Sequence, residues 1–129
     1  MISFQNFRQT DGTPIYLQIV RYIQQGLAAG TIQDGDELPS RRVVSALLAV
    51  NPNTVQKAFK LLEDEGLATS RAGAKSCIQV SPQQIEALRQ AMLETEMQAM
   101  VDAARRMGLS REEAHRLLDA LYDKEGAEV

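Results

Sequence analysis

The sequence has little of what most catalytic and metal sites are built from. Its 129 residues include one cysteine, Cys77, and one histidine, His115, and tryptophan is absent. A lone cysteine cannot form a disulfide within the chain, so we expect a reducing, cytoplasmic setting. These two residues, 38 positions apart, match neither a nucleophile with its base nor a zinc-binding spacing, and there is no phosphate-binding glycine loop. We therefore expect no enzyme activity, no catalytic residues, no metal and no cofactor.

Long apolar runs and aromatic residues are also scarce. No stretch of 18 apolar residues occurs, and the first residues lack a basic region followed by an apolar one. We therefore expect neither a membrane span nor a secretion signal. Aromatic residues make up only 5% of the chain but hydrophobic residues make up 44%, which predicts a mainly aliphatic core. The length fits one compact domain with a short accessory element.

Charge is unevenly distributed along the chain. The net charge of −3 argues at first against a nucleic-acid partner. However, residues 1–80 carry eight Lys and Arg against seven Asp and Glu, whereas residues 81–129 carry six against ten. Six of the positive residues fall between positions 39 and 75, where the acidic residues form one cluster, 63–65. This arrangement allows a modest basic face, which a dimer would double.

An apolar stripe predicts a first helix. Isoleucine and leucine recur at spacing four between positions 15 and 27. Thr13-Pro14 before them is typical of a helix cap followed by a first-turn proline, and Gly30 is typical of a helix end. We expect residues 1–12 to be polar and turn-like, and residues 31–38 to contain a turn and a short strand.

Two more helices are predicted on either side of a tight turn. Ser40 is the expected cap of a helix over about residues 41–48. Its buried face is expected to consist of Val44, Leu47 and Leu48. Asn51-Pro52 is a second cap followed by a first-turn proline, and it begins a helix over about residues 52–65 that Gly66 ends.

A hairpin and two final helices are expected to complete the chain. Residues 67–71 and 76–80 are β-prone and flank a glycine-containing tip, which predicts a hairpin. A long helix follows over about residues 82–107, and Ser110 with Glu113 forms a capping box for the last helix. The apolar faces of these two helices exceed what one small domain can cover. We therefore expect them to form a dimerisation tail.

The order helix, helix, turn, helix, hairpin indicates a winged helix-turn-helix. The predicted fold is mostly α with a small β wing (α+β): a DNA-binding domain over residues 1–80 and a two-helix dimerisation tail over residues 81–129. In this architecture the start of the third helix enters the major groove of DNA. Asparagine and glutamine amides can pair with adenine edges there, and threonine can contact the thymine methyl group.

Nine residues are candidate DNA contacts. They lie at the start of the second helix, at the start of the third helix and at the hairpin tip: Arg41, Arg42, Asn51, Asn53, Thr54, Gln56, Lys57, Gly73 and Lys75. Some have a second interpretation. Asn51 is more typical of a helix cap than of a base-reading residue, and Arg41 and Gln56 are equally typical of solvated surface.

Other polar residues are expected to have structural roles. Tyr16 and Tyr22 are expected to pack rather than to bind a ligand, and Cys77 is expected to be a buried, unreactive thiol. The acidic cluster 63–65 lies at the far end of the third helix, where we expect it to face away from phosphate. The methionines of the tail are expected in the core or the dimer interface rather than at a metal.

Four segments in order resemble the GntR family of bacterial transcription regulators. They are PIYLQI at 14–19, GDELPSRR at 35–42, NPNTV at 51–55 and LEDEGL at 62–67. The short two-helix tail is similar to that of the YtrA subfamily. By this resemblance Arg42, Asn53, Thr54 and Gly73 match DNA-contact positions. Pro52 and Gln56 stand where many members have arginine, and Ala49 stands where glycine is usual.

The resemblance implies a homodimeric repressor of its own operon, often one encoding an ABC transporter. Such a dimer would bind an inverted-repeat operator in double-stranded DNA. The amide-rich third helix predicts a preference for A·T pairs. A small-molecule effector, if one exists, would bind between the wing domain and the tail or in the dimer interface. The alternative is a winged-helix module for protein interaction with little DNA affinity, which the net negative charge favours.

Overall fold

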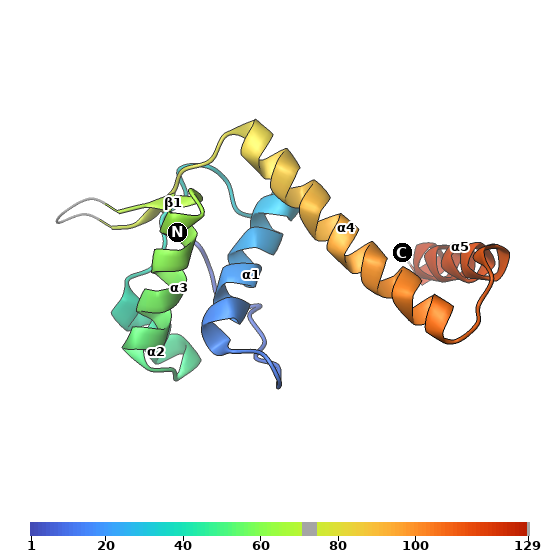
Figure 1. The fold of residues 1–129 in the computed structure, drawn as a ribbon. Helices are drawn as coiled ribbons and strands as arrows, with labels where there is room; N and C mark the ends of the chain where they lie inside the picture. The colour runs from blue at the N-terminus through green and yellow to red at the C-terminus, as the bar shows by residue number, and fades with distance from the viewer. Residues whose placement is uncertain (71–74, 129) are drawn as a thin grey trace. The chain divides into compact units, whose positions relative to one another are not determined.

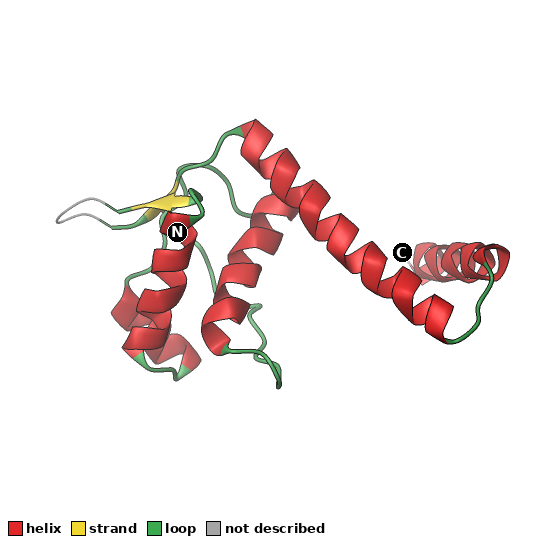
Figure 2. Cartoon of the chain, in the orientation of Figure 1, coloured by secondary structure: helices red, strands yellow, loops and turns green. Residues whose placement is uncertain are grey.

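The computed structural model describes residues 1–70 and 75–128, and these contain five helices and a two-stranded hairpin (Figures 1 and 2). The elements in chain order are α1 (Ile15–Ala29), α2 (Arg41–Leu48), α3 (Pro52–Asp64), β1 (Ala68–Thr69), β2 (Cys77–Ile78), α4 (Pro82–Arg106) and α5 (Arg111–Glu128). The chain divides into two compact units, Met1–Arg89 and Gln90–Val129, with the boundary inside α4. The mostly helical fold with a small β hairpin is the one that the sequence predicts.

The core of the first unit lies between α1, α2 and α3. Helices α1 and α3 lie side by side, and α2 packs against α3 (Figure 1). The apolar stripe of α1 is buried, as its spacing predicts: Ile19 and Ile23 are fully buried. Val55 and Leu62 of α3 are also fully buried, so α3 turns its remaining polar side chains outward.

The start of α1 differs from the sequence prediction. Thr13 does not cap the helix: α1 begins at Ile15, Pro14 precedes it, and no side chain caps its end. Instead the buried amide of Gln18 reaches back into the preceding loop. It accepts a hydrogen bond from the Thr10 amide (2.9 Å) and donates to the carbonyls of Thr10 and Thr13 (2.8 Å each). A long side chain one turn into the helix therefore orders the loop that a cap would otherwise hold.

Helices α2 and α3 both begin with the predicted cap. The Ser40 hydroxyl accepts a hydrogen bond from the Val43 amide, and the Asn51 side chain accepts one from the Asn53 amide at 2.8 Å. Pro52 is the first residue of α3. Between the helices, Ala49 is left-handed, with φ 55° and ψ 46°. Ala49 therefore has a strained conformation that glycine adopts more easily.

The strain at Ala49 predicts the effect of a substitution. Ala49→Gly should raise the free energy of unfolding by about 0.5–1 kcal/mol, because glycine adopts positive φ without a Cβ clash and only part of that gain is lost to chain entropy. The control is Ala46→Gly in the exposed face of α2, which should lower stability by about 1 kcal/mol. Urea unfolding measures both. Equal losses in the two variants would show that Ala49 is not strained.

Helix α2 buries a narrower face than the sequence predicts. Val44 is fully buried and Leu48 packs against the core, but Leu47 is 66% exposed. The helix has only eight residues and meets α3 along one side. Val44 and Leu48, one turn apart, occupy that side, and Leu47 falls beside it.

The hairpin is shorter than predicted but is supported by a third segment. Strands β1 and β2 pair antiparallel, with Ala68 opposite Ile78 and Thr69 opposite Cys77. The segment 34–38 adds a bridge between Glu37 and Cys77, and the Ile78 amide donates to the Asp36 carbonyl at 2.8 Å. Cys77 is half-buried rather than buried, because a two-stranded hairpin has one open face. The predicted tip residue Gly73 lies outside the described residues.

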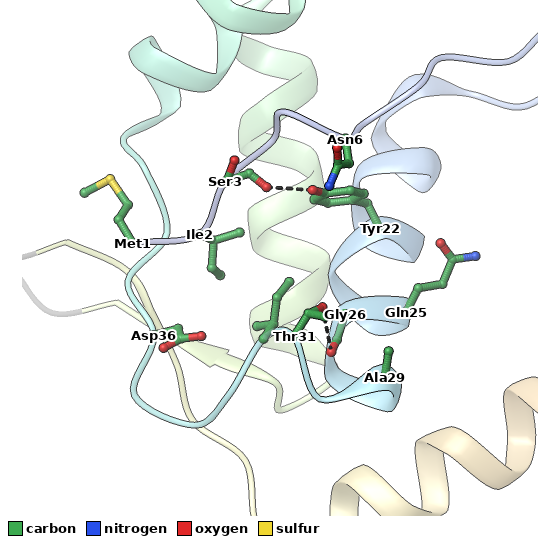
Figure 3. A pocket seen from close by; sticks show the side chains of 11 residues that line it. Met1, Ile2, Ser3, Asn6, Tyr22, Gln25, Gly26, Ala29, Thr31 and Asp36 are labelled. Atoms are coloured by element: carbon green, nitrogen blue, oxygen red, sulfur yellow. Dashed lines mark hydrogen bonds between the residues drawn. The ribbon is translucent and has the colours of Figure 1, made fainter. Parts of the chain in front are cut away.

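The N-terminal segment is part of the core, which corrects the prediction of a polar, turn-like stretch. Ile2, Phe4 and Phe7 are all buried. The Phe4 ring stacks on Tyr22 with centroids 5.2 Å apart, and Phe7 meets the same ring edge-on at 5.5 Å. The Tyr22 hydroxyl of α1 donates a hydrogen bond to the Ser3 carbonyl at 2.6 Å, and Figure 3 shows the Tyr22 side chain reaching this segment. The aromatic residues are few, but three of them form one cluster in the core.

The second unit contains the rest of α4 and α5. Gly108, with φ 73°, follows α4, and the predicted capping box begins α5: Ser110 accepts from the Glu113 amide, and Glu113 accepts from the Ser110 amide. Eight large apolar side chains of this unit are between 41% and 78% exposed: Leu93, Met97, Met100, Val101, Met107, Leu117, Leu121 and Tyr122. Across the described part of the chain, no helix is long and apolar enough to cross a membrane.

Candidate nucleic-acid interface

The first turns of α3 present polar side chains to solvent. Asn53, Gln56 and Lys57 are exposed, and Thr54 is half-buried. They face outward because the apolar residues of α3 face α1 and α2. Asn51 is exposed too, but its side-chain oxygen is used for the helix cap, which confirms its structural interpretation. The start of α3 is thus an exposed, polar helix end, and such an end can read base edges in a major groove.

The two arginines of α2 extend this surface. Both Arg41 and Arg42 are exposed in the first turn of α2. The Arg41 guanidinium donates a hydrogen bond to the side-chain oxygen of Gln56 on α3. The structure therefore brings together the starts of both helices, as the winged helix-turn-helix interpretation requires. It also gives Arg41 a structural role, because its guanidinium orients a candidate base-reading amide.

An open groove of about 610 Å³ runs between the start of α2, one side of α3 and the base of the hairpin. Among the described residues, its charged lining consists of Arg41, Lys60, Glu63 and Lys75. Glu63 was expected to face away from phosphate, but it is half-buried in this groove wall. The reason is helical spacing, since positions 56, 60 and 63 share one side of α3. A carboxylate here repels phosphate but can accept a hydrogen bond from cytosine.

The lysines near this surface have different neighbours. The Lys75 ammonium lies 3.8 Å from the Glu37 carboxylate, and both side chains are 55% exposed. Lys60 pairs with Asp64 at 3.5 Å, one turn along α3. The Lys57 ammonium instead lies 4.1 Å from the centre of the Tyr16 ring. Exposed ion pairs of this kind contribute little and are screened by salt, so phosphate can replace either carboxylate.

Three residues that lie near the candidate DNA contacts were not assigned there from the sequence. These residues are Glu37, Glu63 and Tyr16. The sequence did not point to Glu37, and it predicted other roles for Glu63 and Tyr16. The spacing of Glu63 relative to Gln56 was a usable signal, because seven residues make two helical turns. The contacts of Glu37 and Tyr16 join segments far apart in the sequence, so no local pattern indicates them.

Comparison with known proteins agrees with this geometry. The family model of the bacterial regulatory proteins of the gntR family matches residues 15–76. The HTH-type transcriptional repressor YtrA of Bacillus subtilis (strain 168) is 43% identical over 61 residues, which make up 47% of this chain and 47% of that protein. The uncharacterised HTH-type transcriptional regulator YhcF of the same organism is 31% identical over 100 residues, 78% of this chain and 83% of YhcF.

A solved structure extends the likeness to most of the chain. A GntR family transcriptional regulator from Listeria monocytogenes, 28% identical, matches with a TM-score of 0.80 over 87% of this chain and 98% of that one. The predicted winged-helix fold and the predicted resemblance are both confirmed, and the non-enzymatic function agrees with relatives that are transcription regulators. The chain belongs to the GntR family of bacterial regulatory proteins.

Proposed function

We propose that this DNA-binding transcription regulator is a homodimeric repressor that binds an inverted-repeat operator of its own operon. The observation that carries the proposal is the exposed first turn of α3 beside two exposed arginines. Asn53 and Gln56 supply amides for base edges, while Arg42 supplies a charge for phosphate or a guanine edge. The similarity to the repressor YtrA supports repression. An ABC transporter operon stays a prediction from the family resemblance.

A footprint on the DNA upstream of its own gene tests the operator. We expect a protected segment with two-fold symmetry, whose half-sites lie about one helical turn, 34–36 Å, or a multiple of it apart. A·T pairs should occur at the positions nearest Asn53 and Gln56 if their amides read adenine. Loss of upstream reporter repression on deleting one half-site would support dimeric repression. A single asymmetric half-site with full repression would contradict it.

The surface of α4 supports a dimer. Leu93, Met97, Met100 and Met107 are exposed. Together with the half-buried Ala104, these residues recur at alternating spacings of four and three along α4, and Met107 lies just beyond its last residue, Arg106. That is the heptad spacing by which two helices bury a shared seam. A second copy of this chain would cover these residues and double the modest basic face.

Light scattering on the purified chain tests the dimer. We expect a dimer at micromolar concentration, and a shift to monomer for Met100→Glu, because a carboxylate in the middle of an apolar seam loses its hydration on pairing. The matched control is Thr95→Glu, which adds the same charge at the exposed position opposite the seam and should stay dimeric. A monomeric wild-type chain, or equal behaviour of both variants, would rule out this seam.

A small-molecule effector stays a prediction. The first unit has a hollow of about 510 Å³ beside the N-terminal segment, lined by residues such as Asn6, Tyr22 and Asp36 (Figure 3). Among the described residues, every buried side-chain nitrogen or oxygen already has a hydrogen-bond partner. No buried polar group there therefore calls for a ligand, and a thermal-shift screen is the direct way to find one.

A further inference from the structure

Lys57 is held by a ring rather than by a carboxylate. Its ammonium lies 4.1 Å from the centre of the Tyr16 ring, the geometry of a cation–π contact. Tyr16 belongs to the first turns of α1, is half-buried and packs against the core. Lys57 is exposed in the second turn of α3, next to Gln56. The rigid Tyr16 side chain of α1 thus holds the flexible Lys57 side chain of α3, next to the candidate DNA contact Gln56.

The position of Tyr16 follows from the way α1 and α3 lie together. The two helices run in the same direction, with their N-terminal ends at the same side of the unit (Figure 1). Tyr16 contacts Lys57 near that end, and Gln24 contacts Glu65 at 3.0 Å near the other. The end of α1 that carries Tyr16 is therefore the end nearest the first turn of α3.

The chemistry of the contact leaves Lys57 able to bind DNA. Lys60 and Lys75 each contact a carboxylate, which offsets their charge. An aromatic face attracts an ammonium without neutralising it, so Lys57 keeps its full charge and free N–H donors for phosphate. Fixing a long, flexible side chain before binding also reduces the entropy lost on contact with DNA.

We propose that Tyr16 is a positioning residue for DNA binding, whose ring holds the Lys57 ammonium in place to contact a phosphate of the operator. The inference rests on the proposed function, since it requires that α3 faces DNA. It gives α1 a part in DNA binding beyond its place in the core. It also distinguishes Tyr16 from Tyr22, whose hydroxyl and ring are both used to hold the N-terminal segment.

A double-mutant cycle on the full chain tests the proposal. Binding to a duplex from the upstream region of its own gene is measured over a series of salt concentrations for wild type, Lys57→Gln, Tyr16→Leu and the double variant. Lys57→Gln should weaken binding and reduce the slope of log affinity against log salt by about one for each protomer. Tyr16→Leu should weaken binding about two- to fivefold, with the slope unchanged because the charge remains.

The cycle separates positioning from packing. In the Lys57→Gln background, Tyr16→Leu should cause no further loss, and Tyr16→Phe should bind like wild type because the ring is kept. If Tyr16→Leu is not fully folded at the assay temperature, Tyr16→Met provides a flexible apolar replacement of similar size. Equal losses in both backgrounds, or no loss in either, would overturn the proposal. A wild-type chain that does not bind the duplex would instead overturn the proposed function.

Discussion

An Arg42→Ala variant should bind the operator more weakly by about 1–3 kcal/mol for each protomer contact. Arg42 is exposed in the first turn of α2, beside the start of α3. A guanidinium there makes a charge-assisted hydrogen bond to phosphate or a paired one to guanine, and alanine makes neither. A dimer loses the contact twice, so the total loss is among the largest that one substitution can cause. Fluorescence anisotropy with labelled operator DNA measures it.

The matched control for this variant is Arg89→Ala. Arg89 is also exposed, but it lies on α4. Earlier on α4, the Gln84 side chain donates to the carbonyl of Gly66, which follows the C-terminal end of α3. Removing Arg89 takes away the same charge at the opposite end of the unit, so operator affinity should change little. If the Arg42 variant bound as tightly as wild type, Arg42 would be a surface residue and the α2 side of the interface would be misplaced.

Phe4→Ala should lower the free energy of unfolding by about 3–5 kcal/mol, the loss typical of removing a buried aromatic ring. Phe4 is 5% exposed and stacks on Tyr22, so alanine leaves a cavity and separates the N-terminal segment from α1. This is a large part of the stability of a small domain. Chemical unfolding monitored by circular dichroism provides the measurement.

Gln5→Ala is the control for the N-terminal segment. Gln5 is the exposed neighbour of Phe4, and its backbone carbonyl, which accepts from Arg8, is kept in the variant. Its stability should stay within about 0.5 kcal/mol of wild type. A Phe4 variant as stable as the Gln5 variant would mean that the segment does not belong to the core.

Local cap and turn chemistry made the helix-turn-helix predictable. Ser40 and Asn51 accept hydrogen bonds from amides two or three residues ahead, and Ala49 adopts the left-handed conformation that the turn requires. These interactions act within one helical turn, so they are readable from the sequence without knowledge of the fold. The exposed first turn of α3 follows from them, because the cap and the apolar stripe together set the rotation of the helix.

Contacts between distant segments were not predictable in this way. Phe4 and Phe7 lie in a stretch without helical spacing, and their burial depends on Tyr22 of α1. The contact of Tyr16 with Lys57 likewise depends on how α1 packs on α3. In both cases the contact of an aromatic ring depends on the packing of segments that are distant in the sequence.

Binding to two DNA duplexes over rising salt is the most direct test of the central claim, that the start of α3 reads operator DNA. One duplex comes from the region upstream of the chain's own gene, and the other is a scrambled sequence of the same composition. We expect tighter binding to the first duplex and an affinity that falls steeply as the salt concentration increases. Equal binding to both duplexes, indifferent to salt, would contradict it and favour a winged-helix module that binds protein.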